Sequence, residues 1–201
     1  MNGYFGSQCQ FNRLNSTLFP GSTILDNNLG IKLVNLTNLP LTKSPFELLY
    51  QASIDGFSAA SFHSKCDGVQ GTFIVMKSNY SNIFGGYTSA DWSPGYYQYK
   101  YDSSAFLFSL VNSYNMSLKM NIISTNNAIF TGSSYSVTFG GGFDLSCYDD
   151  QKCYSYLGKT YQLPSFLTMY SQQAQSFLGG NYSFSAVEIE VYSIFIDRKL
   201  H

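Results

Sequence analysis

Residues 48–88, LLYQASIDGFSAASFHSKCDGVQGTFIVMKSNYSNIFGGYT, carry three structural signals in a fixed order. The first is Asp55-Gly56-Phe57, which predicts a tight turn before a short helix, because Asp is a favoured N-cap and Gly tolerates unusual backbone angles. We expect Asp55 to cap this helix and Phe57 to reach the core. The helix should end near Cys66-Asp67-Gly68.

The other two signals are strands. Residues 73–76 form an unbroken apolar run of strand length, which predicts a strand covered on both faces. Residues 82–88 predict a second strand, interrupted by Gly85-Gly86. A glycine pair inside a strand indicates a bulge or the close approach of another segment, so we expect Gly85 and Gly86 to be structural.

The segments before this stretch have weaker signals. Residues 1–21 show no clear periodicity and are predicted to form an N-terminal arm, with residues 22–201 as a single domain. Ser22 or Asp26 could cap a short helix that runs through Leu33. Pro45 predicts a helical turn that leads into residues 46–49.

The segments after this stretch are dominated by strands. Apolar or alternating patterns predict strands at residues 105–110, 118–123, 135–139, 143–148 and 184–196. Many short strands with few helices favour a mostly β fold with short flanking helices, built as a two-sheet antiparallel β-sandwich. The expected core includes Phe73, Val75, Phe106, Phe108, Val187, Ile189 and Val191.

Composition narrows the function classes. Charged residues make up only 11% of the chain and the net charge is −1, so no uniformly basic surface for nucleic acid is available. No segment is apolar for long enough to span a bilayer, and residues 1–19 lack the apolar region of a signal peptide. We therefore expect a cytoplasmic protein that neither inserts into membranes nor binds nucleic acid.

The cysteines give no metal or redox motif. The chain has no Cys-x-x-Cys spacing, so neither a zinc knuckle nor a thioredoxin-like motif is predicted. In a cytoplasmic chain we expect four reduced and mostly buried thiols, Cys9, Cys66, Cys147 and Cys153.

Five segments in order resemble the TLDc (TBC/LysM-associated) domain family. They are the stretch 48–88, Ser104-Ala105-Phe106-Leu107-Phe108-Ser109-Leu110, Phe139-Gly140-Gly141-Gly142-Phe143-Asp144-Leu145, Phe177-Leu178-Gly179-Gly180 and the closing segment 184–192. The closing strand of the family usually ends Glu-Val-Trp. Here Glu190-Val191-Tyr192 keeps the acid and replaces Trp by Tyr. The resemblance covers about residues 22–196.

The resemblance implies a two-sheet β-sandwich flanked by short helices. It also implies a role in protection against oxidative damage, because family members are associated with that protection. Several bind the vacuolar proton-pumping ATPase and promote its disassembly, which suggests vacuolar ATPase subunits as the protein partner. The resemblance implies no enzyme activity.

His63 and Cys66 lie three residues apart and should share a helix face. This pair could contribute to a metal site or activate a thiolate. A metal would need carboxylates from elsewhere, because the only other histidine is His201. The plainer interpretation is a surface histidine beside a half-buried cysteine, so we predict no metal site.

Gly140-Gly141-Gly142 could cradle an anion through backbone N–H groups, but the Lys and the following helix of a phosphate loop are missing. We expect these glycines to permit a strand crossing or bulge. Asp144, Asp149 and Asp150 are expected to form a solvated acidic loop, because the calcium-loop pattern is absent.

The closing strand carries two acids at period-two spacing. Glu188, Glu190 and Tyr192 should point to one side, which on a sandwich strand is usually solvent, while Val187, Ile189 and Val191 point to the other. If that side were enclosed, an acid/base role for one carboxylate would become conceivable.

Two functions follow from this reading. The first is a non-catalytic protein-interaction domain without cofactor or metal, in oxidative-stress resistance or vacuolar ATPase regulation. The alternative is a thiol-dependent antioxidant enzyme or redox sensor that uses Cys66. No catalytic residues are predicted for the first function, and the motif positions Asp55, Gly56, Phe57, His63, Cys66, Gly85, Gly86, Gly140, Gly141, Gly142 and Glu190 are assigned mainly structural roles.

Overall fold

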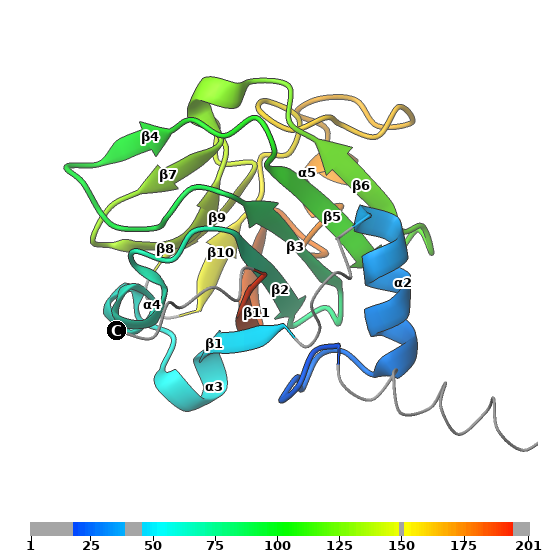
Figure 1. The fold of residues 1–201 in the computed structure, drawn as a ribbon. Coiled ribbons are helices and arrows are strands. Elements are labelled where there is room, and N and C mark those ends of the chain that lie inside the picture. The colour runs from blue at the N-terminus through cyan, green and yellow to red at the C-terminus, as the bar shows by residue number, and fades with distance from the viewer. Residues whose placement is uncertain (1–17, 39–45, 149–150, 195–201) are drawn as a thin grey trace, which may run out of the picture.

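The computed structural model describes residues 18–38, 46–148 and 151–194 (Figure 1). These residues form eleven strands, which pair antiparallel, and a few short helices. The elements in chain order are α2 (Asn27–Thr37), β1 (Glu47–Gln51), α3 (Ala52–Asp55), α4 (Ala59–Cys66), β2 (Thr72–Ser78), β3 (Ile83–Thr88), β4 (Gln98–Lys100), β5 (Phe106–Val111), β6 (Leu118–Asn121), η1 (Thr125–Asn127), β7 (Ile129–Thr131), β8 (Tyr135–Phe139), β9 (Leu145–Tyr148), β10 (Lys152–Tyr154), α5 (Gln172–Ser176) and β11 (Ser183–Ser193).

The longest strand, β11, joins two halves of the sheet. The strand order is β4-β7-β8-β9-β10-β11-β2-β3-β5-β6, and β1 pairs with β11 as well. The first residues of β11 pair with β10, and the rest of the strand pairs with β1 and β2. The two halves therefore meet at β11, and a mostly antiparallel β fold with short helices is confirmed.

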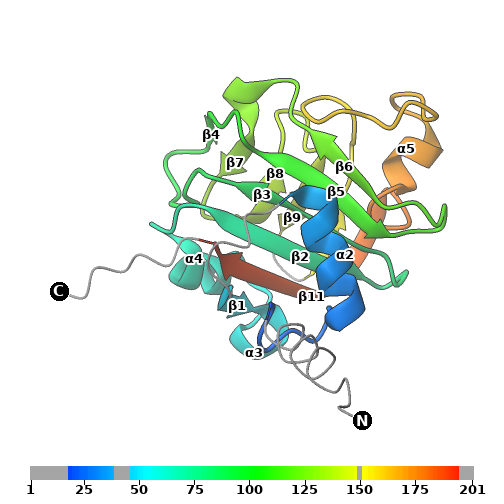
Figure 2. The ribbon, with the colours of Figure 1, turned by 45° about the vertical axis from the view of Figure 1, so that its right-hand side comes forward.

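Two apolar clusters lie on the two faces of the half that contains β2. Ile74 and Met76 belong to the cluster between the halves, together with Val137 and Phe139 of β8. Residues 73 and 75 point the other way, into a cluster that α2 covers (Figure 2). The apolar run at residues 73–76 is therefore covered on both faces, as its sequence predicts.

The segment before β2 differs in part from its prediction. Asp26 caps α2 by accepting a hydrogen bond from Leu29 N at 2.8 Å, and the helix runs past Leu33 to Thr37. The helical turn predicted for residues 46–49 is wrong, because Glu47–Gln51 form β1 along β11. Pro45 lies outside the described residues, as does most of the predicted arm. Phe19 of that arm stacks on Phe46.

A β-bulge changes the orientation of one predicted core residue. The pairing of β11 with β2 shifts register between Ala186 and Glu188. The extra residue turns Val187 outward, and its side chain is 52% exposed. Its assignment to the core is wrong, whereas Ile189 and Val191 beyond the bulge are buried as expected.

The bulge gives a matched pair of variants in one strand. Ile189→Ala should lower the free energy of unfolding by about 3 kcal/mol, because it leaves a cavity in the cluster between the two halves of the sheet. Val187→Ala removes a half-exposed side chain and should change it by less than about 0.5 kcal/mol. Urea denaturation measures the change in free energy of unfolding for both variants. Equal losses in the two variants would contradict the bulge.

Two cysteines differ from the expectation of four free thiols. Cys147 of β9 and Cys153 of β10 lie opposite each other in the ladder and form a disulfide. Both are buried. The expectation failed because the antiparallel pairing across the short connection between these strands sets the two residues face to face. Cys66 is a buried free thiol, and Cys9 lies outside the described residues.

None of the helices formed by the described residues is both long and apolar enough to cross a bilayer.

Candidate functional site

The Asp55-Gly56-Phe57 motif forms a turn, but Asp55 does not cap the following helix. Ser58 caps α4, with its hydroxyl accepting from Ser61 N. Asp55 ends α3, where it accepts from Gln51 N at 2.9 Å and pairs with Lys65 at 2.9 Å. The prediction of an Asp55 N-cap is wrong because Asp55 is the last residue of α3, and α4 begins only at Ala59. Gly56 adopts a φ of +98°, which glycine tolerates. Phe57 is partly buried and packs against the cluster between the two halves of the sheet.

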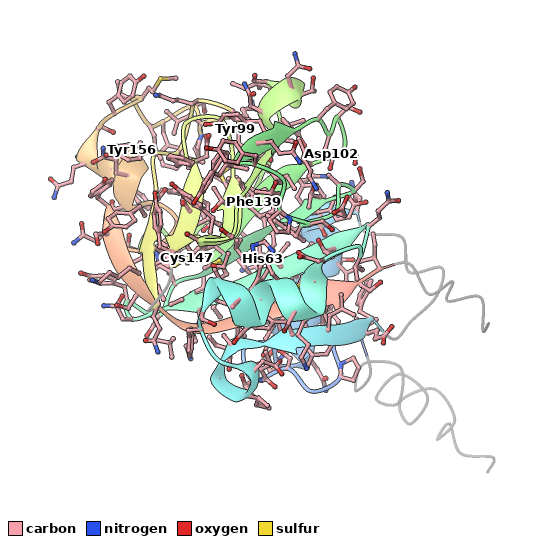
Figure 3. The ribbon with its side chains drawn as sticks, turned by 90° about the vertical axis from the view of Figure 1, so that its left-hand side faces the viewer. His63, Tyr99, Asp102, Phe139, Cys147 and Tyr156 are labelled. Atoms are coloured by element: carbon pink, nitrogen blue, oxygen red, sulfur yellow. A yellow bond between two sulfur atoms is a disulfide. The ribbon has the colours of Figure 1, made fainter. Side chains whose placement is uncertain are left out.

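His63 and Cys66 both point into the fold from α4. His63 Nδ1 lies 2.7 Å from Asp67 Oδ1, and Nε2 lies 2.9 Å from the carbonyl oxygen of Tyr135. The histidine therefore connects α4 to the start of β8 and is buried rather than on the surface (Figure 3). Burial raises the pKa of the Cys66 thiol above its ordinary value. A buried thiol with a raised pKa is a poor nucleophile.

The two glycine motifs lie where other atoms approach closely. A Cβ on Gly85 would lie 2.0 Å from the carbonyl oxygen of Ile74, and one on Gly86 would lie 2.8 Å from the Phe139 ring. The close approach expected at this pair is therefore present, and Gly86 lets the β8 half pack against β3.

A Cβ on Gly140 would lie 2.2 Å from Asp144 Oδ2, and the φ of Gly140 is +91°. Cβ atoms on Gly141 and Gly142 would crowd the side chains of Asn127 and Lys159. The three glycines thus make room for neighbouring side chains.

Asp144 is fully buried, so its assignment to a solvated loop is wrong. Its Oδ1 accepts hydrogen bonds from the backbone N–H groups of Gly158, Lys159 and Tyr161, and its Oδ2 accepts one from Thr160 N at 3.0 Å. Burial raises the pKa of Asp144, while these donors act in the opposite direction. The carboxylate organises the loop after β10. Asp149 and Asp150 lie outside the described residues.

Glu188 and Glu190 are also buried, against the expectation of a solvent-facing pair. Each of their four carboxylate oxygens accepts at least two hydrogen bonds. Glu190 binds Thr23 N at 2.6 Å and Tyr192 Oη at 2.9 Å, and Glu188 binds Ser53 N at 3.0 Å. The solvent-facing prediction failed because residues 22–24 and the start of α3 cover β11 and supply the donors. Saturated carboxylates of this kind hold segments together.

Among the described residues, no three His, Cys, Asp or Glu side chains gather as a metal site would require.

The outer side of the β4–β10 half carries a continuous series of aromatic rings that the sequence analysis did not identify. Adjacent rings in the series lie within 6.3 Å of one another, centroid to centroid. We call this surface the tyrosine face. Its members are Tyr97, Tyr99, Phe130, Tyr135, Phe143, Tyr148, Tyr154, Tyr156 and Tyr182.

The tyrosine face runs from Tyr99 to Tyr156, which remain 42% and 37% exposed. Both are labelled in Figure 3, which views the fold from the side of β4, β7 and β8. Burial, and then a hydrogen bond to Tyr148, raise the pKa of Tyr135 to about 12. The Tyr135 hydroxyl at the centre of the face therefore stays protonated at neutral pH.

One end of the tyrosine face is hollowed into a cavity of about 330 Å³, which we call the tyrosine cleft. Its lining comes from β9, β10 and the loops beside them, including the residue just before β11. The lining residues are Phe143, Ser146, Tyr148, Lys152, Tyr154, Tyr156 and Tyr182. The disulfide lies on the inner side of the same two strands, β9 and β10.

A comparison with models of protein families identifies the family of this chain. The TLDc domain model matches residues 18–195, which is most of the chain. The chain belongs to the TLDc domain family. No curated protein matches it.

In this TLDc domain the family-like motifs and the tyrosine face occupy different places. The residues at the motifs are buried or tightly packed: Glu190 and Cys66 are fully enclosed, and Gly85 has no room for a side chain. The match begins at residue 18, so it includes Phe19, which packs against Phe46 and Tyr192.

Sequence signals for the tyrosine face exist but are weak. Tyr97 and Tyr99, like Tyr154 and Tyr156, are spaced two residues apart, which indicates one face of a strand. The strand order of the TLDc domain is needed to show that these separate pairs join in one surface.

Proposed function

We propose that this TLDc domain is a non-catalytic protein-interaction domain and that the tyrosine face is its docking surface. The supporting observation is a contrast between its chemical groups. The candidate reactive groups Cys66, His63, Asp144, Glu188 and Glu190 are buried, whereas the tyrosine face is partly exposed. Tyrosine is enriched at protein interfaces because it offers a large apolar area and a polar hydroxyl at a small entropic cost.

Family membership supports a more specific role in oxidative-stress resistance or in regulation of the vacuolar proton-pumping ATPase, with subunits of that ATPase as the partner. We propose a cytoplasmic location for this role. Disulfides are uncommon in that compartment. Burial of Cys147 and Cys153 limits access of cellular thiols to their bond.

The alternative, a thiol-dependent antioxidant enzyme or redox sensor using Cys66, has less support. Peroxide reacts with accessible thiolates. Cys66, the last residue of α4, is buried, and that burial raises the pKa of its thiol.

The test is affinity capture from lysate of the source organism with the full chain as bait. Tyr99→Ala and Tyr156→Ala together should reduce the captured partner by about tenfold or more, since interface aromatics often dominate binding. Tyr170→Ala, which changes a 63% exposed tyrosine outside the tyrosine face, is the matched control and should leave capture unchanged.

A peroxide-consumption assay on the wild type and on Cys66→Ser tests the alternative. Capture of no partner together with catalytic, Cys66-dependent peroxide consumption would contradict the proposed function.

A further inference from the structure

We propose that the tyrosine cleft binds an extended peptide segment that combines prolines with acidic residues. This inference rests on the proposed function and specifies the kind of partner. Three properties of the cleft support it: the way its rings pack, the polar atoms it presents and its charge.

The rings in the cleft pack edge to face, so they form ridges with grooves between them. Tyr156 and Tyr182 lie 4.8 Å apart with an interplanar angle of 65°, and Tyr148 and Tyr154 lie 5.8 Å apart at 82°. A flat sugar ring stacks best on a flat exposed ring. Grooves between tyrosines instead suit proline rings of an extended chain, as in other aromatic-lined peptide sites. A cavity of about 330 Å³ has room for a short stretch of such a chain.

The polar groups of the cleft can all donate hydrogen bonds. The facing backbone of β9 and β10 is used within the sheet, and the buried Ser146 hydroxyl is hydrogen-bonded to Thr138. These bonds leave the tyrosine hydroxyls and one ammonium group. Tyr182 donates to the Tyr156 hydroxyl at 2.5 Å, so the Tyr156 proton is available to a ligand. That hydrogen bond raises the pKa of Tyr182 to about 12, which keeps the hydroxyl protonated. A proline-rich segment matches these donors, because it has carbonyl acceptors and few N–H groups.

The charge of the cleft comes from Lys152, the one charged residue in its lining. Within the described part of the chain, the Lys152 ammonium has neither an ion pair nor a hydrogen bond. A carboxylate on the partner would pair with this ammonium. A single cation is too little for a nucleic-acid backbone, which favours the peptide.

The test uses isothermal titration calorimetry with the full chain and three probes. The probes are a synthetic twelve-residue peptide of repeating Glu-Pro-Pro, its Lys-Pro-Pro counterpart and the oligosaccharide cellohexaose. We expect the acidic peptide to bind at least about tenfold more tightly than the basic one, and the sugar not to bind.

Two variants locate the binding. Tyr156→Ala should weaken binding of the acidic peptide by about tenfold or more, because it opens the groove beside Tyr182. Lys152→Glu should reverse the preference between the two peptides. The controls are Tyr170→Ala and Lys32→Glu, which change an exposed tyrosine and an exposed lysine elsewhere, and both should bind as the wild type does.

The proposal is overturned if neither peptide binds, if Lys152→Glu leaves the preference unchanged, or if the sugar binds in place of the peptide. Capture of a partner through the tyrosine face without peptide binding would overturn this inference alone and leave the proposed function standing. If the full chain also captures no partner from the lysate, both this inference and the proposed function are contradicted.

Discussion

Asp144→Ala should lower the free energy of unfolding by about 4 kcal/mol, because it leaves several buried backbone donors without an acceptor. The wild-type carboxylate accepts from four consecutive N–H groups, those of residues 158–161. Asp144→Asn retains one acceptor oxygen and should recover part of the loss. Urea denaturation followed by circular dichroism gives the values.

Asp26→Ala is the matched control for this prediction. Asp26 also accepts a backbone hydrogen bond, but it lies exposed at the N-terminus of α2. Loss of an exposed cap should cost about 1 kcal/mol. If Asp144→Ala costs no more than Asp26→Ala, the loop of residues 158–161 does not depend on the carboxylate.

Gly85→Ala should cost about 4 kcal/mol or more, and the variant chain is expected to fold poorly. The new Cβ would lie 2.0 Å from the carbonyl oxygen of Ile74 and 3.0 Å from the ring of Phe108. Neither neighbour can move freely, because β3 lies between β2 and β5 in the sheet. Soluble yield and the urea midpoint measure the effect.

Gly68→Ala provides the comparison. Gly68 has a φ of +74° but no atom within 4 Å of the position of a new Cβ. Gly68→Ala should therefore lower the free energy of unfolding only by the backbone strain, about 1 kcal/mol. Gly85 is not among the glycines with positive φ, so equal effects at Gly68 and Gly85 would contradict crowding as the reason for a glycine at this strand position.

Sequence patterns predicted the structure correctly where the conformation of a segment depends mainly on its own residues. The strands β2, β3 and β8 were predicted because their apolar runs have strand length and are bounded by turn residues. The turn at Gly56 and the close approach at Gly85 followed from the conformational freedom of glycine and from its lack of a side chain.

Predictions failed where a distant segment decides the outcome. Glu190 was predicted to face solvent because most sandwich strands expose their acids, but residues 22–24 supply its donors. Pro45 suggested a helix start, yet residues 47–51 form a strand because β11 offers them a partner. Val187 fits the alternation of its strand and is displaced only by the bulge.

The tyrosine face could not be predicted for the same reason. Tyr99, Tyr135 and Tyr154 are far apart in the chain and come together through the order β4-β7-β8-β9-β10. The disulfide likewise depends on the register between β9 and β10, which the cysteine spacing does not specify.

The position of β11 has a consequence for how the chain is made. This strand supplies the centre of the sheet, where Tyr192 pairs with Leu48 on one side and with Phe73 on the other. A ribosome adds about 5–20 residues per second, so β11 emerges on the order of ten seconds after β1 and β2. Until β11 is made, the edges of β1, β2 and β10 that pair with it stay unpaired, and the apolar surface that it covers stays exposed. Chaperones that bind nascent chains are therefore expected to protect this domain until its last strand is synthesised.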